Sequence, residues 1–294
     1  MRWRTSLSNS PVSRISSSAS MTTRELPMNL NLVQRSILDR RISLIIYALG
    51  VAAYGILMTS IWPSMADDLS TLEQLWENYP EGLKTVFGAD IPFTRFDGFL
   101  TLEYFTIMWI IIGVAFSASV ATGALAGEID KGTMELLLAQ PVSRVSVVLS
   151  KMLFHAAGLA FLIAATMIPL KLGALVIDAE LSTRGVAALS LLLFFFVMSF
   201  GSLGFLFSAW FSDRGRAVFA VVGLLIFAYA LDILAKFNDF IGNFHFLSLF
   251  RYYDPYPYMH SATIDWSDLA VYAGISLTAS ALAAFHFRRR DIAV

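Results

Sequence analysis

Long apolar runs separated by short polar segments dominate this chain. A helix crosses the hydrocarbon core of a bilayer in about 20 residues. Six runs reach that length: residues 42–62, 102–125, 145–168, 186–210, 217–235 and 269–287. A shorter apolar run at 170–177 contains Lys171, and we interpret it as the outer end of the third span. The pattern predicts an all-α polytopic membrane protein with about six transmembrane helices.

Composition supports this interpretation. The chain is 57% hydrophobic and only 15% charged, whereas soluble domains carry roughly a quarter charged residues. Cysteine is absent, which excludes disulfides, thiolate metal sites and cysteine nucleophiles.

The distribution of Lys and Arg predicts the orientation, because cytoplasmic loops are enriched in both. With the N-terminus inside, 15 of the 21 Lys and Arg fall in cytoplasmic segments and the other 6 fall outside. We therefore predict that both termini are cytoplasmic, in agreement with the even number of spans. We expect a multi-pass protein of the plasma (inner) membrane.

Residues 1–28 differ from the rest. They are rich in Ser, contain four Arg and have no acid before Glu25. This composition is that of a transit peptide, but a disordered cytoplasmic leader, or a true start at Met21 or Met28, explains it as well. We expect the membrane domain to occupy residues 29–294.

Two predicted outer loops are long. In residues 63–101, apolar side chains at helical spacing predict amphipathic helices on the outer interface. Residues 236–268 are aromatic and interrupted by proline, which we interpret as an interfacial cap rather than a ligand cage.

A short charged segment, residues 127–144, lies between the second and third spans; we call it the elbow. Gly127 ends the second span, and residues 128–140 have the mixture of apolar and polar side chains of an amphipathic helix. Pro141 stops that helix, and Ser143 can cap the next one. The sequence predicts an amphipathic helix across the mouth of a helical hairpin. On spacing alone, a plain connector is an equally good interpretation.

The residues of the elbow closely resemble those of ABC-2 type exporter permeases. The pattern is Glu128-x3-Gly132-Thr133-x-Glu135-x-Leu137-Leu138-x2-Pro141-x-Ser143-Arg144. Weaker matches occur at residues 78–84, at Phe87-Gly88 and at residues 287–292, and the resemblance covers about residues 29–294. It implies a membrane-spanning permease subunit, a second permease copy in a homodimer or heterodimer, and a separate ATP-binding subunit docked on a coupling helix in the elbow.

The resemblance also implies which elbow residues couple the two subunits. They are Glu128, Asp130, Lys131, Gly132, Thr133, Glu135, Leu137, Leu138, Pro141, Ser143 and Arg144. The chain has no G-x4-G-K-[ST] loop, so we expect no cofactor here, with ATP and Mg bound by the partner subunit.

Other chemistry has little support in the sequence. The four histidines have no i, i+4 pairing and no carboxylate at ligand spacing, so we expect no metal site. Hydrolase motifs are absent, and we expect no catalytic residue and no nucleic-acid partner. A membrane-embedded enzyme and a non-transporting membrane scaffold are the alternatives, and nothing in the spans selects a cargo.

Small residues recur on two spans and predict close helix packing. We expect this packing to lie inside one subunit rather than between two. The residues are Ser119, Gly123 and Gly127 on the second span, and Gly201, Gly204 and Ser208 on the fourth.

Overall fold

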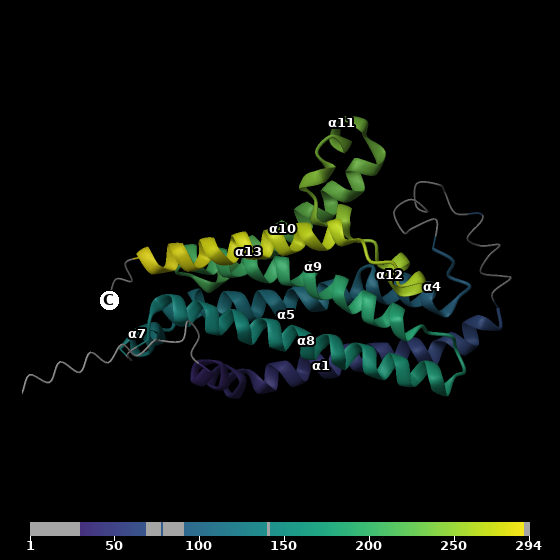
Figure 1. The fold of residues 1–294 in the computed structure, drawn as a ribbon, viewed down its shortest axis with the longest axis horizontal. Coiled ribbons are helices and arrows are strands. Elements are labelled where there is room, and N and C mark those ends of the chain that lie inside the picture. The colour runs from purple at the N-terminus through teal and green to yellow at the C-terminus, as the bar shows by residue number, and fades with distance from the viewer. Residues whose placement is uncertain (1–29, 69–77, 79–90, 140–141, 291–294) are drawn as a thin grey trace, which may run out of the picture.

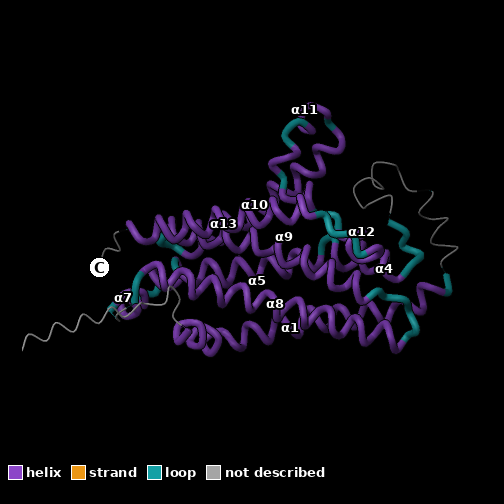
Figure 2. The backbone as a smooth tube through the Cα atoms, viewed as in Figure 1, coloured by secondary structure: helices purple, strands orange, loops and turns teal. Residues whose placement is uncertain are grey.

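Long helices run side by side along one direction in the computed structural model, which describes residues 30–68, 78, 91–139 and 142–290 (Figure 1). The described residues contain helices and no strand (Figure 2). The helices are α1 (Leu30–Ala66), α4 (Phe96–Leu100), the π-helix η1 (Thr101–Phe105), α5 (Met108–Ala124), α6 (Ala126–Asp130), α7 (Thr133–Leu138), α8 (Arg144–Val176), α9 (Thr183–Trp210), α10 (Arg214–Phe237), α11 (Asp239–Gly242), the 3₁₀ turns η2 (His245–Leu247) and η3 (Leu249–Tyr252), α12 (Pro255–Ser261) and α13 (Trp266–Arg289).

The helices cover all six predicted apolar runs and give five to six candidate spans. Five of them, α1, α8, α9, α10 and α13, are each long and apolar enough to cross a bilayer. The stretch α4–η1 and α5 together are also long and apolar enough, but they are bent by 42° at a break, so they form either a broken sixth span or a re-entrant loop. Helix α8 continues to Val176, so the short apolar run at 170–177 is the end of the third span, as predicted.

The bend in the second span was not predicted. The amide of Thr106 donates to the carbonyl of Thr101 at 2.9 Å, a bond one residue longer than that of an α-helix. The Thr106 hydroxyl donates to the same carbonyl at 2.8 Å. Such side-chain competition for backbone carbonyls bends helices, so a run that is uniformly apolar in sequence contains a local break.

Helix α9 is the centre of the bundle and contacts α5, α8, α10, α12 and α13. Its Phe196 is fully buried and packs against the rings of Phe250, Tyr253 and Tyr272. The Tyr253 hydroxyl donates to the carbonyl of Phe105 at 2.8 Å, and burial raises the pKa of Tyr253. The interpretation of residues 236–268 as an interfacial cap was therefore wrong for η3 and Tyr253, which pack into the bundle.

The small residues bring helices of the same chain together, as predicted. A Cβ on Gly201 would lie 2.1 Å from His155 Cε1, and one on Gly204 would lie 3.0 Å from the Ala121 Cβ. A Cβ on Gly123 would lie 2.2 Å from Arg40 Nη2.

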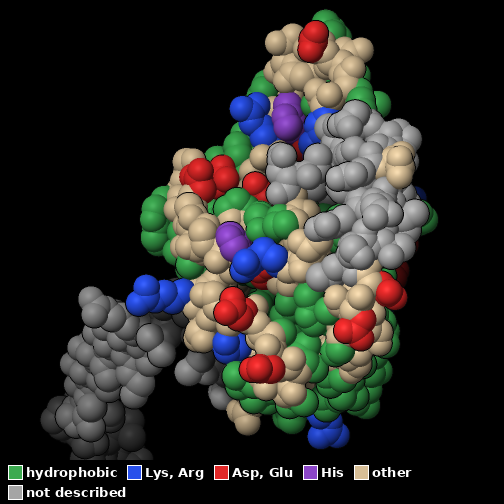
Figure 3. All heavy atoms as spheres, turned by 90° about the vertical axis from the view of Figure 1, so that its right-hand side faces the viewer, with side chains coloured by type: hydrophobic (Ala, Val, Ile, Leu, Met, Phe, Trp, Pro, Cys, Tyr) green, Lys and Arg blue, Asp and Glu red, His purple; other side chains and the backbone are tan. Residues whose placement is uncertain are grey.

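The two ends of the bundle differ. The start of α1, the helices α6 and α7 and the end of α13 lie together at what we call the elbow end (Figure 1). Helices α4 and α12 lie at the opposite end, whose surface carries acidic, basic and histidine side chains among apolar patches (Figure 3). The described chain thus begins and ends at the same end of the bundle.

Several predictions concern residues outside the described part of the chain. They are the leader at 1–28, the amphipathic helices expected within 69–77 and 79–90, the motif matches at 79–84 and Phe87-Gly88, and Pro141, Asp291 and Ile292.

Candidate functional site

The elbow contains two short helices where the sequence predicted one. Helix α6 ends at Asp130, Lys131 and Gly132 form a turn, and α7 begins at Thr133. Gly132 has φ +68°, a left-handed conformation that glycine adopts without steric cost. A single helix over residues 128–140 was therefore wrong, because the chain turns at Gly132.

A side chain from another span separates α5 from α6. In a continuous helix, the amide of Ala126 would bond to the carbonyl of Thr122. Instead, the Ala126 amide donates to Ser208 Oγ on α9 at 2.8 Å, and Ser208 Oγ donates to the Thr122 carbonyl at 3.1 Å. The serine thus bridges a break at Leu125, and Gly127 lies buried inside α6 rather than at the end of the span.

One face of α7 packs onto the bundle. Met134 and Leu137 are 1% and 8% exposed and join Val147 and Val148 of α8 in one apolar cluster. Leu138 is half-buried beside them. Leu137 and Leu138, two of the predicted coupling residues, thus lie on the face of α7 that contacts the bundle.

The other face of the elbow is exposed. It carries Asp130, Lys131, Thr133 and Glu135, four of the predicted coupling residues. Leu136 lies among them and is 73% exposed.

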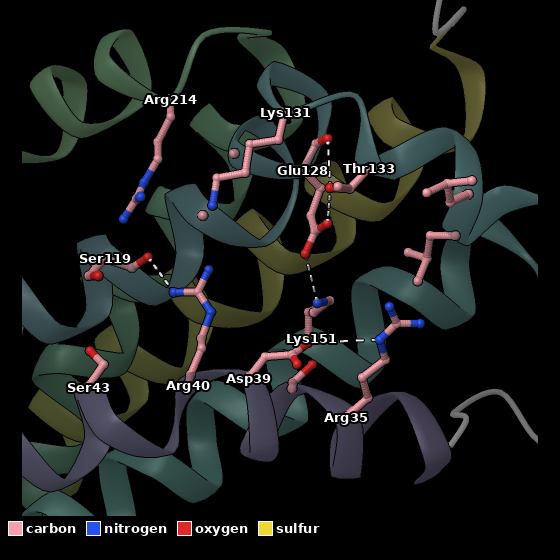
Figure 4. Close-up of a pocket in the computed structure, with 15 residues that line it drawn as sticks. Arg35, Asp39, Arg40, Ser43, Ser119, Glu128, Lys131, Thr133, Lys151 and Arg214 are labelled. Carbon is pink, nitrogen blue, oxygen red and sulfur yellow. Dashed lines mark hydrogen bonds and ion pairs between the residues drawn. The ribbon is translucent and has the colours of Figure 1, made fainter.

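Glu128 has a different environment from the other predicted coupling residues. Its carboxylate Oε1 lies 3.5 Å from Lys151 Nζ on α8, and the Thr133 hydroxyl donates to its Oε2 (Figure 4). The same hydroxyl is 3.2 Å from the Glu128 carbonyl. Glu128 therefore joins α6, α7 and α8 inside the protein.

Ser143 caps the third span, as predicted. Its side chain accepts a bond from the Ser146 amide at 3.1 Å, the usual geometry of a serine N-cap. Helix α8 begins at Arg144.

Arg144 lies in a network that connects three spans. It donates to the carbonyl of Arg290, the residue after α13. The Arg290 guanidinium donates to the carbonyls of Ala209 at 2.7 Å and Phe211 at 3.1 Å, at the end of α9. Burial lowers the pKa of Arg290, although an arginine stays charged in proteins. In the sequence, Arg290 belongs to residues 287–292, which resemble a stretch of ABC-2 type permeases, but nothing in the sequence indicated which residues it contacts.

A cavity of about 770 Å³ lies at the elbow end, enclosed by α1, α5, the elbow, α8 and α10. Arg40 crosses it and donates to the carbonyl of Ser119 at 3.0 Å. Sequence reasoning counted its basic residues as markers of the cytoplasmic side, and only Lys131 also as a coupling residue. The lining residues are Arg35, Ser36, Asp39, Arg40, Ser43, Ser119, Gly123, Gly127, Glu128, Lys131, Thr133, Leu136, Leu137, Lys151 and Arg214.

The described residues contain no group of three His, Asp or Glu that could hold a metal ion. Two histidines do contact carboxylates that are distant in sequence. His245 Nε2 lies 2.8 Å from Asp232 Oδ1, and His260 Nδ1 lies 2.6 Å from Asp97 Oδ2. Sequence spacing could not reveal these pairs.

A family described as ABC-2 family transporter protein matches residues 30–292, a stretch that contains the elbow and every described helix. No curated protein matches the chain.

Proposed function

Because the chain belongs to the ABC-2 family of transporter proteins and is a multi-pass membrane permease, we propose that a separate ATP-binding subunit drives it through the elbow. The observation that carries this proposal is the two-sided structure of α7. Glu135 and Leu136 are exposed, while Met134 and Leu137 pack onto α8. A partner that contacts the outer face would act directly on the third span.

The contacts of the elbow suggest how movement would spread. The Glu128–Lys151 pair connects the elbow to α8, and Ser208 connects the start of α6 to α9. In our proposal, ATP binding closes the partner dimer, the elbow shifts, and these contacts carry the shift into the spans. The exchange of the Ser208 bridge for a direct bond between Ala126 and Thr122 would straighten the second span during this step.

We further propose that the elbow end is cytoplasmic and that the pathway opens to the outside. The distribution of basic residues supports this orientation. Eleven of them lie on segments at the elbow end: Arg35, Arg40, Arg41, Lys131, Arg144, Lys151, Arg214, Arg216, Arg288, Arg289 and Arg290. Both termini would then be cytoplasmic and the membrane the plasma (inner) membrane.

A second permease copy completes the proposal. Helix α1 leaves large apolar side chains uncovered, among them Ile42, Ile46 and Leu49, each more than 60% exposed. Lipid and a second subunit are both suitable neighbours for such a face. We propose a homodimer or heterodimer of permeases bound to two ATP-binding subunits.

Co-purification tests the proposed partner. The chain is expressed with the ATP-binding subunit of its transporter, and the complex is isolated through a tag on the permease. We expect Glu135→Lys combined with Leu136→Ser to release the ATP-binding subunit while the permease still inserts. Arg216→Glu, an equally exposed charge change at the same end but outside the elbow, serves as the control. An intact complex with the elbow variant would contradict the proposal and favour a scaffold or enzyme.

A further inference from the structure

Three basic side chains from three different elements meet in the cavity at the elbow end. Arg40 comes from α1, Lys131 from the turn between α6 and α7, and Arg214 from the start of α10. Figure 4 shows all three pointing into the same space. Arg214 is close enough to Arg40 for the two guanidinium groups to repel each other. Such a convergence is unfavourable unless an anion lies between the cations.

The two acidic side chains of the cavity, Glu128 and Asp39, attract Arg40 electrostatically, but their ion-pair contacts are with other residues. Glu128 pairs with Lys151 at 3.5 Å, and Asp39 lies 3.9 Å from Arg35. In the described part of the chain, no carboxylate lies within ion-pair distance of Arg40, Lys131 or Arg214. The cavity is lined by five basic and two acidic residues, which gives it a surplus of three positive charges.

The site is partly preorganised. The Arg40 side chain lies against Gly123 and is held by its bond to the Ser119 carbonyl. The Arg214 side chain packs against Gly127. Small residues on α5 and α6 thus leave room for two guanidinium groups, which bind phosphate oxygens in a planar, two-pronged geometry.

The surroundings of the cavity suit a lipid. One helical turn beyond Ser43, which lines the cavity, α1 carries the exposed apolar side chain of Ile46, and Leu49 is exposed one turn further on. An acyl chain could follow these side chains while its headgroup occupies the cavity. Basic pockets between spans on the cytoplasmic side are chemically suited to anionic headgroups.

We propose that Arg40, Lys131 and Arg214 form a binding site for an anionic phosphate group at the elbow end. The phosphate is carried by an inner-leaflet lipid headgroup or is free in solution. Its binding joins α1, the elbow and α10, whose three cations otherwise repel one another. This site does not depend on an ATP-binding partner.

Competition binding tests the site on the full chain purified in neutral detergent. The probe is phosphatidylglycerol with a fluorescent acyl chain, displaced by unlabelled phosphatidylglycerol, phosphatidylcholine or inorganic phosphate. We expect Lys131→Gln with Arg214→Gln to weaken probe binding by about tenfold or more, since bonds from charged donors are lost. The conservative Arg214→Lys should retain most of the binding.

The matched control removes the same charge from outside the cavity. Arg41 and Arg216 are exposed at the same end and do not line it. Arg41→Gln with Arg216→Gln should change binding by less than about twofold, as expected for exposed charges. Equal weakening by both double variants would overturn the proposal, because it would indicate general attraction to a positive surface.

The competitors identify the source of the phosphate. Displacement by unlabelled phosphatidylglycerol alone supports a lipid headgroup, and displacement by inorganic phosphate supports the free ion. Displacement by phosphatidylcholine as strong as by phosphatidylglycerol would contradict a site for an anionic group. So would unchanged probe binding in a cavity variant that elutes as a folded, monodisperse protein.

Discussion

The Nζ of Lys151 lies 3.5 Å from Oε1 of Glu128 and joins the third span to the elbow. Both side chains are shielded, at 11% and 28% exposure, so water screens this pair less than a surface ion pair. Because Thr133 also donates to the Glu128 carboxylate, one acid connects both helices of the elbow to α8.

Loss of this pair should destabilise the protein. Glu128→Gln leaves the buried Lys151 ammonium without its carboxylate, and we expect a cost of about 1–3 kcal/mol. Thermal unfolding in detergent measures the loss, and Glu135→Gln on the exposed face is the control. A double-mutant cycle with Lys151→Met isolates the pair. Strictly additive effects of the two changes would show that the pair contributes no coupling.

Ser208→Ala tests the bridge at the break of the second span. The change removes both the acceptor for the Ala126 amide and the donor to the Thr122 carbonyl. We expect a loss of stability of about 1 kcal/mol and weaker stimulation of ATP hydrolysis in the reconstituted complex. Ser190→Ala is the control on the same helix, since Ser190 bonds only to the carbonyl of Val186. If Ser208→Ala and Ser190→Ala gave the same stability and the same stimulation of ATP hydrolysis, the Ser208 bridge would have no role in coupling.

Gly123→Ala tests the packing of Arg40. The new Cβ would lie 2.2 Å from Arg40 Nη2, so the guanidinium must move, and such overpacking costs about 1–3 kcal/mol. We expect a lower unfolding temperature and weaker binding of the fluorescent lipid. Gly223→Ala on α10, where nothing lies within 4 Å of the new Cβ, should not lower either quantity. Unchanged lipid binding in Gly123→Ala would show that Arg40 does not contact the ligand.

Arg290→Gln should loosen the elbow end. The variant loses the bonds to the carbonyls of Ala209 and Phe211, and we expect faster hydrogen exchange around the end of α9. Arg288→Gln, which changes an exposed residue two positions earlier, is the control. Exchange that is the same in both variants would show that Arg290 does not fasten α9 to α13.

The spans could be predicted from sequence because length and hydropathy are local properties. Five of the six apolar runs correspond to single helices long enough to span a bilayer, and the other is the bent pair. Ser143 caps α8 because a serine cap depends only on the next few residues. The division of the elbow into two helices also had a local signal, which is Gly132, because glycine adopts the left-handed conformation of a turn without steric cost. We had interpreted Gly132 as one position of a single amphipathic helix.

The break at Leu125 and the cavity had no local signal. The break depends on Ser208, which is 82 residues from Ala126. The cavity needs Arg40, Lys131 and Arg214 to meet, and the sequence of each segment alone gives no sign that the three side chains share one space. Glu128 likewise looked like a surface acid, because its partner Lys151 lies on another helix. Tertiary packing decides all of these features.

The central claim is that the exposed face of α7 docks an ATP-binding subunit. A photocrosslinking residue at position 136 tests it directly, because Leu136 is 73% exposed at the elbow end. The same crosslinker at position 266 is the control, since Trp266 is 69% exposed at the start of α13, at the far end of that span. We expect the ATP-binding subunit to be captured in intact cells from position 136 and not from position 266. Capture from position 266, or its absence at position 136 in a complex that still hydrolyses ATP, would contradict the account.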